Sequence, residues 1–133
     1  MSKLHVGKQE LRSSYRRKRA VIRELPQTDP TALLLWCYAI ECGLKLVLLN
    51  KRQLHHTSQF GDDDLTHDLN SIQKKLGQSP TFQSMPTEKP PGTSVGSNTY
   101  HQLFRYGGRL SPTNHERLQN QFSEVAAWID EQI

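Results

Sequence analysis

Two opposite charges interrupt the most apolar segment of the chain. Glu41 and Lys45 stand four residues apart within ALLLWCYAIECGLKLVLL, residues 32–49. At this spacing on a helix, an acid followed by a base lies on one face and the two side chains attract each other. A helix that is apolar on nearly all sides is surrounded by other elements, so its charged groups need partners. We expect Glu41 and Lys45 to form an internal ion pair; the alternative is a polar pair that faces a ligand.

A second charged pattern lies near the N-terminus. The segment 8–24 contains seven basic and two acidic residues, a local charge of +5, which leaves −1 for the rest of the chain. Five of these bases recur at helical spacing beside an apolar stripe: Lys8, Arg12, Arg16, Arg19 and Arg23. Such a stripe could bind the phosphates of RNA or another polyanion. The alternative is a solvated flank, because long cationic side chains often border a core.

Metal chemistry is not indicated. His55 and His56 precede three aspartates, 62–64, but consecutive residues rarely converge on one ion. Cys37 and Cys42 are five residues apart on one expected helix, which suits neither a disulfide nor a shared metal. We expect two free thiols, no metal ion and no other cofactor.

The elements that position these residues are predicted to be helices. A chain of 133 residues fits a single domain, 1–133, with a core of its own. Its apolar residues follow helical spacing, so we predict an all-α antiparallel bundle of four to five helices.

The expected helices cover residues 6–25, 30–53, 65–76 and 98–106, and a final one starts near 111–113 with Thr113 and Glu116 as a capping box. The segment 78–97 holds four prolines and two glycines, which predicts a long, flexible loop.

The expected cellular location follows from the same segments. The first ten residues have no apolar stretch typical of a signal peptide. The segment 32–49 is barely long enough to span a membrane, and Glu41 and Lys45 near its middle would be costly in lipid. We expect a cytoplasmic protein that has no membrane partner.

Three short motifs resemble the HEPN superfamily of small helical bundles. They are YAIECGLK at 38–45, HDL at 67–69 and FRYG at 104–107, and the resemblance spans residues 32–133. HEPN proteins include metal-independent endoribonucleases of defence and toxin-antitoxin systems. Others are non-catalytic modules that bind a nucleotide or a partner protein. The resemblance implies a bundle that engages RNA, and it leaves both functions open.

In the HEPN nucleases, an arginine and a histidine four to six residues apart act on RNA, commonly from a homodimer. The matching spacing here is Arg109 and His115. The arginine would neutralise the scissile phosphate, and the histidine would act as general acid or base. Leu110 stands where a polar residue is common, and Pro112 lies between the pair, so one rigid helix is not expected to present both. Chance spacing is the alternative.

A polar cluster is the second candidate site. His67 could hydrogen-bond Glu41 from the first turn of its helix, which would be a structural role. Alternatively, Glu41, Lys45, His67 and Arg105 form a polar cluster in a cleft of the bundle that binds a nucleotide or tunes an active site. The possible partners are thus RNA or another polyanion, a second copy of the chain, and a protein encoded nearby, such as an antitoxin.

Overall fold

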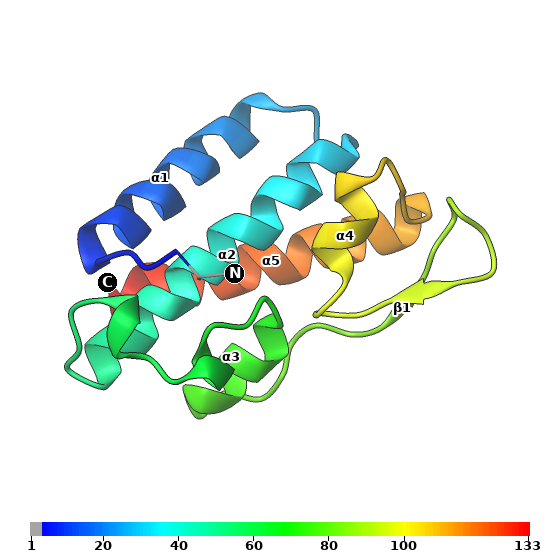
Figure 1. Cartoon of the computed structure of the whole chain (residues 1–133). Coiled ribbons are helices and arrows are strands. Elements are labelled where there is room, and N and C mark those ends of the chain that lie inside the picture. Colours follow the sequence, from blue (N-terminus) through cyan, green and yellow to red (C-terminus); the bar gives the residue numbers. More distant parts are fainter. Residues whose placement is uncertain (1–3) are drawn as a thin grey trace.

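The computed structural model describes residues 4–133 and is mostly helical, which confirms the all-α class (Figure 1). Within residues 4–133, two short 3₁₀ helices and one two-stranded hairpin supplement five α-helices. The elements in chain order are α1 Lys8–Glu24, α2 Pro30–Lys51, η1 Thr57–Gln59, η2 Asp62–Asp64, α3 Leu69–Lys75, β1 Met85–Pro86, β2 Ser94–Val95, α4 Tyr100–Arg105 and α5 Pro112–Gln132.

Helix α2 is the centre of the molecule, as its composition predicts. It begins at Asp29, whose side chain accepts a hydrogen bond from the Thr31 amide, and Pro30 occupies the first helical position. Helices α1, α3, α4 and α5 all pack against it (Figure 1). It is long and apolar enough to cross a membrane, but 72% of its apolar window is buried inside this protein, as in the core helix of a bundle.

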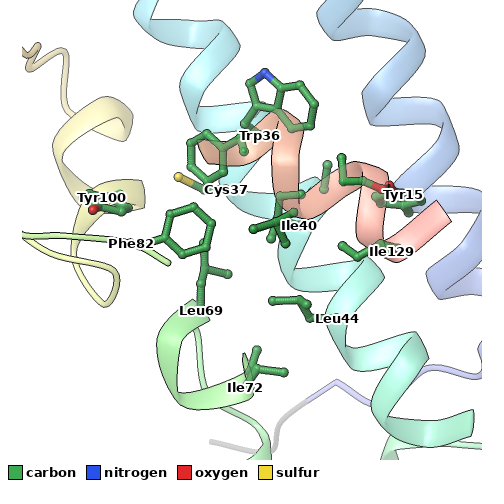
Figure 2. Packing of buried hydrophobic residues seen from close by; sticks show 14 of the residues in the cluster. Tyr15, Trp36, Cys37, Ile40, Leu44, Leu69, Ile72, Phe82, Tyr100 and Ile129 are labelled. Carbon is green, nitrogen blue, oxygen red and sulfur yellow. Dashed lines mark hydrogen bonds between the residues drawn. The ribbon is translucent and has the colours of Figure 1, made fainter. Parts of the chain in front are cut away.

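The core depends on a close approach of three helices at Gly43. A Cβ atom added there would lie 2.9 Å from Ile129 of α5 and 3.0 Å from the Tyr15 ring of α1. About two turns away, the indole of Trp36, which Figure 2 labels, stacks on Phe122 of α5 with ring centroids 5.9 Å apart. The predicted apolar stripes supply these contacts. Their buried members are Leu11, Tyr15 and Ile22 on α1, and Leu118, Phe122, Val125 and Ile129 on α5.

One helix cap and one helix start differ from the prediction, although α5 begins at Pro112, within the predicted range 111–113. Helix α5 is capped by Ser111, whose hydroxyl accepts from the Asn114 amide, so the expected capping box at Thr113 is wrong. Helix α3 begins four residues later than expected, because the Asp68 side chain caps it by accepting from the Asn70 amide. His67 therefore lies before the helix and not in its first turn.

The segment 78–97 is mostly loop, as predicted, but it is attached to the core. Strands β1 and β2 pair antiparallel, with Met85 opposite Val95, and both side chains are buried. Phe82 is buried too, and its backbone amide and carbonyl each bond the side chain of Asn70 on α3. The proline content did not indicate these contacts. The flexibility of the loop stays a prediction.

Candidate functional site

The site starts from the charged pair on α2. Lys45 Nζ lies 3.0 Å from Glu41 Oε2, and the two side chains are only 10% and 16% exposed. The predicted internal ion pair is therefore confirmed. Burial would raise the pKa of Glu41, but the hydrogen bond from His67 and the charge of Lys45 outweigh it and hold that pKa below its usual value.

His67 reaches the other oxygen of the same carboxylate. Its Nδ1 lies 2.7 Å from Glu41 Oε1, the contact expected from the sequence. The ring is held from a loop, yet 61% of its side chain is exposed, so Nε2 is left for a ligand. The hydrogen bond to Glu41 raises the pKa of His67, because the carboxylate stabilises the protonated ring.

His101 is a second histidine that sequence reasoning missed. Its ring centroid lies 5.2 Å from that of His67, and no hydrogen bond to its ring forms within residues 4–133. The residue is 7% exposed. Burial lowers the pKa of His101, and the charges of His67 and Arg105 lower it further. The sequence did contain a signal for His101: it stands four residues before Arg105, and this spacing places both side chains on one face of α4.

Arg105 completes the arrangement. Its guanidinium donates a hydrogen bond to the Tyr38 hydroxyl, and the Tyr38 ring centroid lies 6.4 Å from that of His101. The predicted polar cluster thus shares one face of α2, with members from α4 and the loop before α3. We call this set the histidine site: Tyr38, Glu41, Lys45, His67, His101 and Arg105. Beside it lies a groove of about 430 Å³ with a mostly apolar lining.

The predicted pair Arg109 and His115 lines one surface groove of about 780 Å³. Each side chain already has a partner, however. Arg109 Nε lies 2.9 Å from Glu88 Oε1, and the buried His115 ring donates from Nε2 to the Gln27 carbonyl at 2.7 Å. His115 therefore ties α5 to the connection between α1 and α2.

The backbone of Arg109 is more fixed than the sequence indicated. Its amide and carbonyl both bond Lys89, at 2.9 and 3.1 Å. The preceding Gly108 makes this approach possible, because a Cβ atom there would lie 2.8 Å from the Lys89 carbonyl oxygen. The loop before α5 is thus held against the hairpin segment.

One member of the basic stripe on α1 has a structural role. Arg19 pairs with Asp130 of α5, and its guanidinium lies over the rings of Tyr15 and Trp36, 5.4 and 5.9 Å from their centroids. Its assignment as a free phosphate-binding cation is therefore not supported. The other members form no ion pair among the residues that the structure describes: Lys8, Arg12, Arg16 and Arg23.

The acidic loop 62–64 also has a structural role. Asp64 accepts from Arg52 and Lys75, each at 2.7 Å. Burial would raise its pKa, but these bonds outweigh it and lower the pKa to about 2. Among the described residues, no three histidine, cysteine or acidic side chains converge as metal ligands. Cys37 and Cys42 are free thiols, as predicted.

No family model, curated protein or solved structure matches this chain. The relation to HEPN proteins and the function are therefore proposals, made from the motifs and the geometry of the site.

Proposed function

We propose that this protein is a HEPN-like endoribonuclease that binds RNA and cleaves it without a metal ion at the histidine site. One observation carries the proposal. His67 and His101 lie side by side, and their surroundings move their pKa values in opposite directions. Two neighbouring groups with separated pKa values are suited to act as acid and base near neutral pH.

The roles follow from the protonation states. Neutral His101 takes the proton of a ribose 2′-hydroxyl, and the 2′-oxygen attacks the adjacent phosphorus. The bond from phosphorus to the 5′-oxygen breaks, and protonated His67 gives its proton to that leaving oxygen. The products are a 2′,3′-cyclic phosphate and a 5′-hydroxyl. The Arg105 guanidinium neutralises charge on the phosphate during the step.

RNA binding would come mainly from α1. Beyond the unpaired members of the stripe, Arg17 and Lys18 add two more cations to the same helix, and neither forms an ion pair within residues 4–133. A helix with this excess attracts phosphates and releases their counterions. The resemblance implies a homodimer, which would double this basic surface. Sedimentation equilibrium of the purified protein tests whether the dimer forms.

The histidine site is preferred to Arg109 and His115 for a geometric reason. The Nε2 proton of His115 is engaged by a backbone carbonyl, whereas the Nε2 of His67 has no partner in the described chain. An acid that protonates a leaving group needs a free proton within reach of substrate.

The second candidate is a non-catalytic module that binds a nucleotide or a partner protein. The burial of His101 favours it, since the residue is only 7% exposed and gives a 2′-hydroxyl little access to the ring. In that case Glu41, His67 and Lys45 would form a structural network that shapes a binding surface.

Substitutions at the histidine site and at His115 distinguish a nuclease from a binding module. Purified protein is incubated with RNA in EDTA, beside His67→Gln, His101→Gln and His115→Gln, with circular dichroism as a check of folding. We expect the first two to lower the rate about 100-fold or more, the usual scale for loss of acid or base help. His115→Gln, whose amide can still donate to Gln27, should keep the parent rate. Loss of activity only in His115→Gln would move the reaction centre to the other groove, and intact RNA with the parent protein would favour the binding module.

A further inference from the structure

The apolar groove beside the histidine site contains a cation with unused hydrogen-bonding capacity. Lys45 lines this groove, and its side chain is 10% exposed. Its Nζ forms one hydrogen bond within residues 4–133, to Glu41 Oε2 at 3.0 Å. An ammonium group has three N–H donors, so two are left for a ligand. A charged donor that is largely buried without its full set of partners is costly, and an acceptor atom bound there would recover part of that cost.

The rest of the groove suits a flat, largely apolar group. Its apolar walls come from the segment before α1, from α1 itself and from the loop before α3; the side chains are Leu4, Val6, Leu11 and Leu65. The volume of about 430 Å³ lies in the range of small-molecule sites, which combine apolar walls with a few polar groups. A nucleobase has the matching character, because its faces are apolar and its edge carries hydrogen-bonding groups.

His67 connects the groove to the proposed reaction. It is one of the residues that line the groove, whereas His101 is not. In the proposed reaction, protonated His67 gives its proton to the 5′-oxygen that leaves. The nucleoside attached to that oxygen, on the 3′ side of the cut, therefore lies at the groove.

The charged end of the groove favours one kind of base edge. Both carboxylate oxygens of Glu41 already accept hydrogen bonds, one from Lys45 and the other from His67. The unused capacity at this end is therefore that of a donor, Lys45. Uracil and guanine present a keto oxygen on the edge away from the sugar, which accepts a hydrogen bond from lysine. Cytosine and adenine present an amino group at the same place, which cannot accept one.

We infer that this groove binds the nucleobase on the 3′ side of the cut, and that Lys45 selects a keto base, uracil or guanine, over an amino base. The inference rests on the proposed function for the position of the cut. The contacts that select the base do not require cleavage, so base binding and cleavage can be tested separately.

Hypoxanthine and adenine give the sharpest comparison, because they have the same size and the first carries a keto oxygen where the second carries an amino group. An oligodeoxynucleotide with a single ribonucleotide confines the cut to one bond, and the base after that bond is made hypoxanthine or adenine. We expect kcat/KM to be about tenfold or more higher with hypoxanthine, the scale of one charged hydrogen bond. Equal kcat/KM values for the two substrates would overturn the inference.

Lys45→Met removes the ammonium group and keeps the length of the side chain. The ratio of the two kcat/KM values should fall to about one, whatever the substitution does to the rate itself, because the keto oxygen loses its donor. Circular dichroism checks the fold. Lys74→Met, which removes an exposed lysine from α3, should keep the ratio of the parent. A ratio that Lys45→Met leaves unchanged would overturn the assignment.

A thiol in the groove reports base binding without cleavage and without a substitution. Cys42 lines the groove and is partly exposed, whereas Cys37 is buried. The rate at which iodoacetamide labels Cys42 is measured by mass spectrometry with short oligonucleotides that are 2′-deoxy throughout and carry only hypoxanthine, only adenine or no base. We expect hypoxanthine to protect Cys42 at concentrations about tenfold lower than adenine, and the abasic chain to give no protection.

The two proposals can fail independently. Protection of Cys42 by hypoxanthine in a protein that leaves RNA intact would support the groove as a base site and reject the nuclease. Cleavage of RNA together with equal labelling of Cys42 in all three mixtures would support the nuclease and overturn the groove as a base site.

Discussion

The Glu41 carboxylate contacts two basic side chains at once. One carboxylate oxygen contacts buried Lys45 and the other contacts exposed His67, so this residue links the interior of the bundle to its surface. Sequence reasoning found both partners, because the spacing to Lys45 is local and the HDL motif pointed to His67. It could not find the ring contact between His67 and His101, which depends on the angle at which α4 crosses α2.

Removal of this carboxylate should destabilise the protein. Glu41→Ala leaves Lys45 charged and largely desolvated, and breaking such a buried pair costs about 3 kcal/mol or more. Urea unfolding measures the loss. Glu124→Ala, which removes an exposed acid from α5, should change the free energy of unfolding by no more than about 0.5 kcal/mol. A loss below about 1 kcal/mol for Glu41→Ala would mean that the pair is well solvated.

The pH dependence of cleavage should identify the two histidines. The reaction needs neutral His101, whose pKa is lowered from 6.5, and protonated His67, whose pKa is raised from 6.5. The kcat/KM should therefore rise as pH passes the pKa of His101 and fall as it passes the pKa of His67, with a maximum between them.

Glu41→Gln gives the matched test of this profile. The substitution removes the charge that raises the pKa of His67, so the descending limb should move to lower pH. The ascending limb should move little, because burial is the largest cause of the His101 shift. A descending limb that stays in place would show that His67 is not the acid.

At the scale of elements, α2 and the apolar stripes could be predicted because each follows from local sequence. Asp29 and Pro30 mark the start of α2, and helical spacing marks its neighbours. The late start of α3 could not be predicted in this way, since the Asp68 side chain competes with the helix for the backbone amides. The anchoring of the hairpin segment depends on long-range burial of Phe82 and Met85, which composition does not indicate.

The approach of α1, α2 and α5 at Gly43 should be sensitive to a single methyl group. Gly43→Ala would press a Cβ atom against Ile129 and Tyr15, and overpacking of this kind costs about 1–3 kcal/mol. Thermal unfolding of Gly43→Ala measures it. Ser13→Ala, on the exposed face of α1, should be neutral or slightly stabilising, because alanine favours helix. An unchanged Gly43→Ala melting temperature would contradict this helix packing.

The cations of α1 should dominate binding to RNA. Arg12, Arg16 and Arg23 changed together to Glu should weaken binding by about tenfold or more at 0.1 M salt and reduce its dependence on salt, because fewer counterions are released. Arg19 is left intact, since its pairing with Asp130 makes it part of the fold. The control reverses exposed charges on other elements: Lys74, Lys89 and Arg117. Equal loss in the control would show that only net charge matters.

At the scale of the whole molecule, α2 separates two surfaces of different chemistry. One carries the histidine site, with contributions from α4 and the loop before α3. The other carries the groove of Arg109 and His115, which lies between the α1–α2 connection, the loop before α5 and the first turns of α5. The sequence predicted Glu41, Lys45, His67 and Arg105 as one group and Arg109 and His115 as another, but it indicated neither His101 nor the division between two faces. That division depends on which helix lies on which side of α2.

The proposed function depends on cleavage of RNA through the ribose 2′-hydroxyl. The most direct measurement is the chemistry of the ends formed when a defined RNA oligonucleotide is incubated with the protein in EDTA, beside an identical oligonucleotide with one 2′-deoxy residue at the cleaved position. We expect 2′,3′-cyclic phosphate and 5′-hydroxyl ends, and no cleavage at the 2′-deoxy position. Cleavage of the 2′-deoxy substrate, 5′-phosphate ends, or RNA left intact would contradict the proposed reaction.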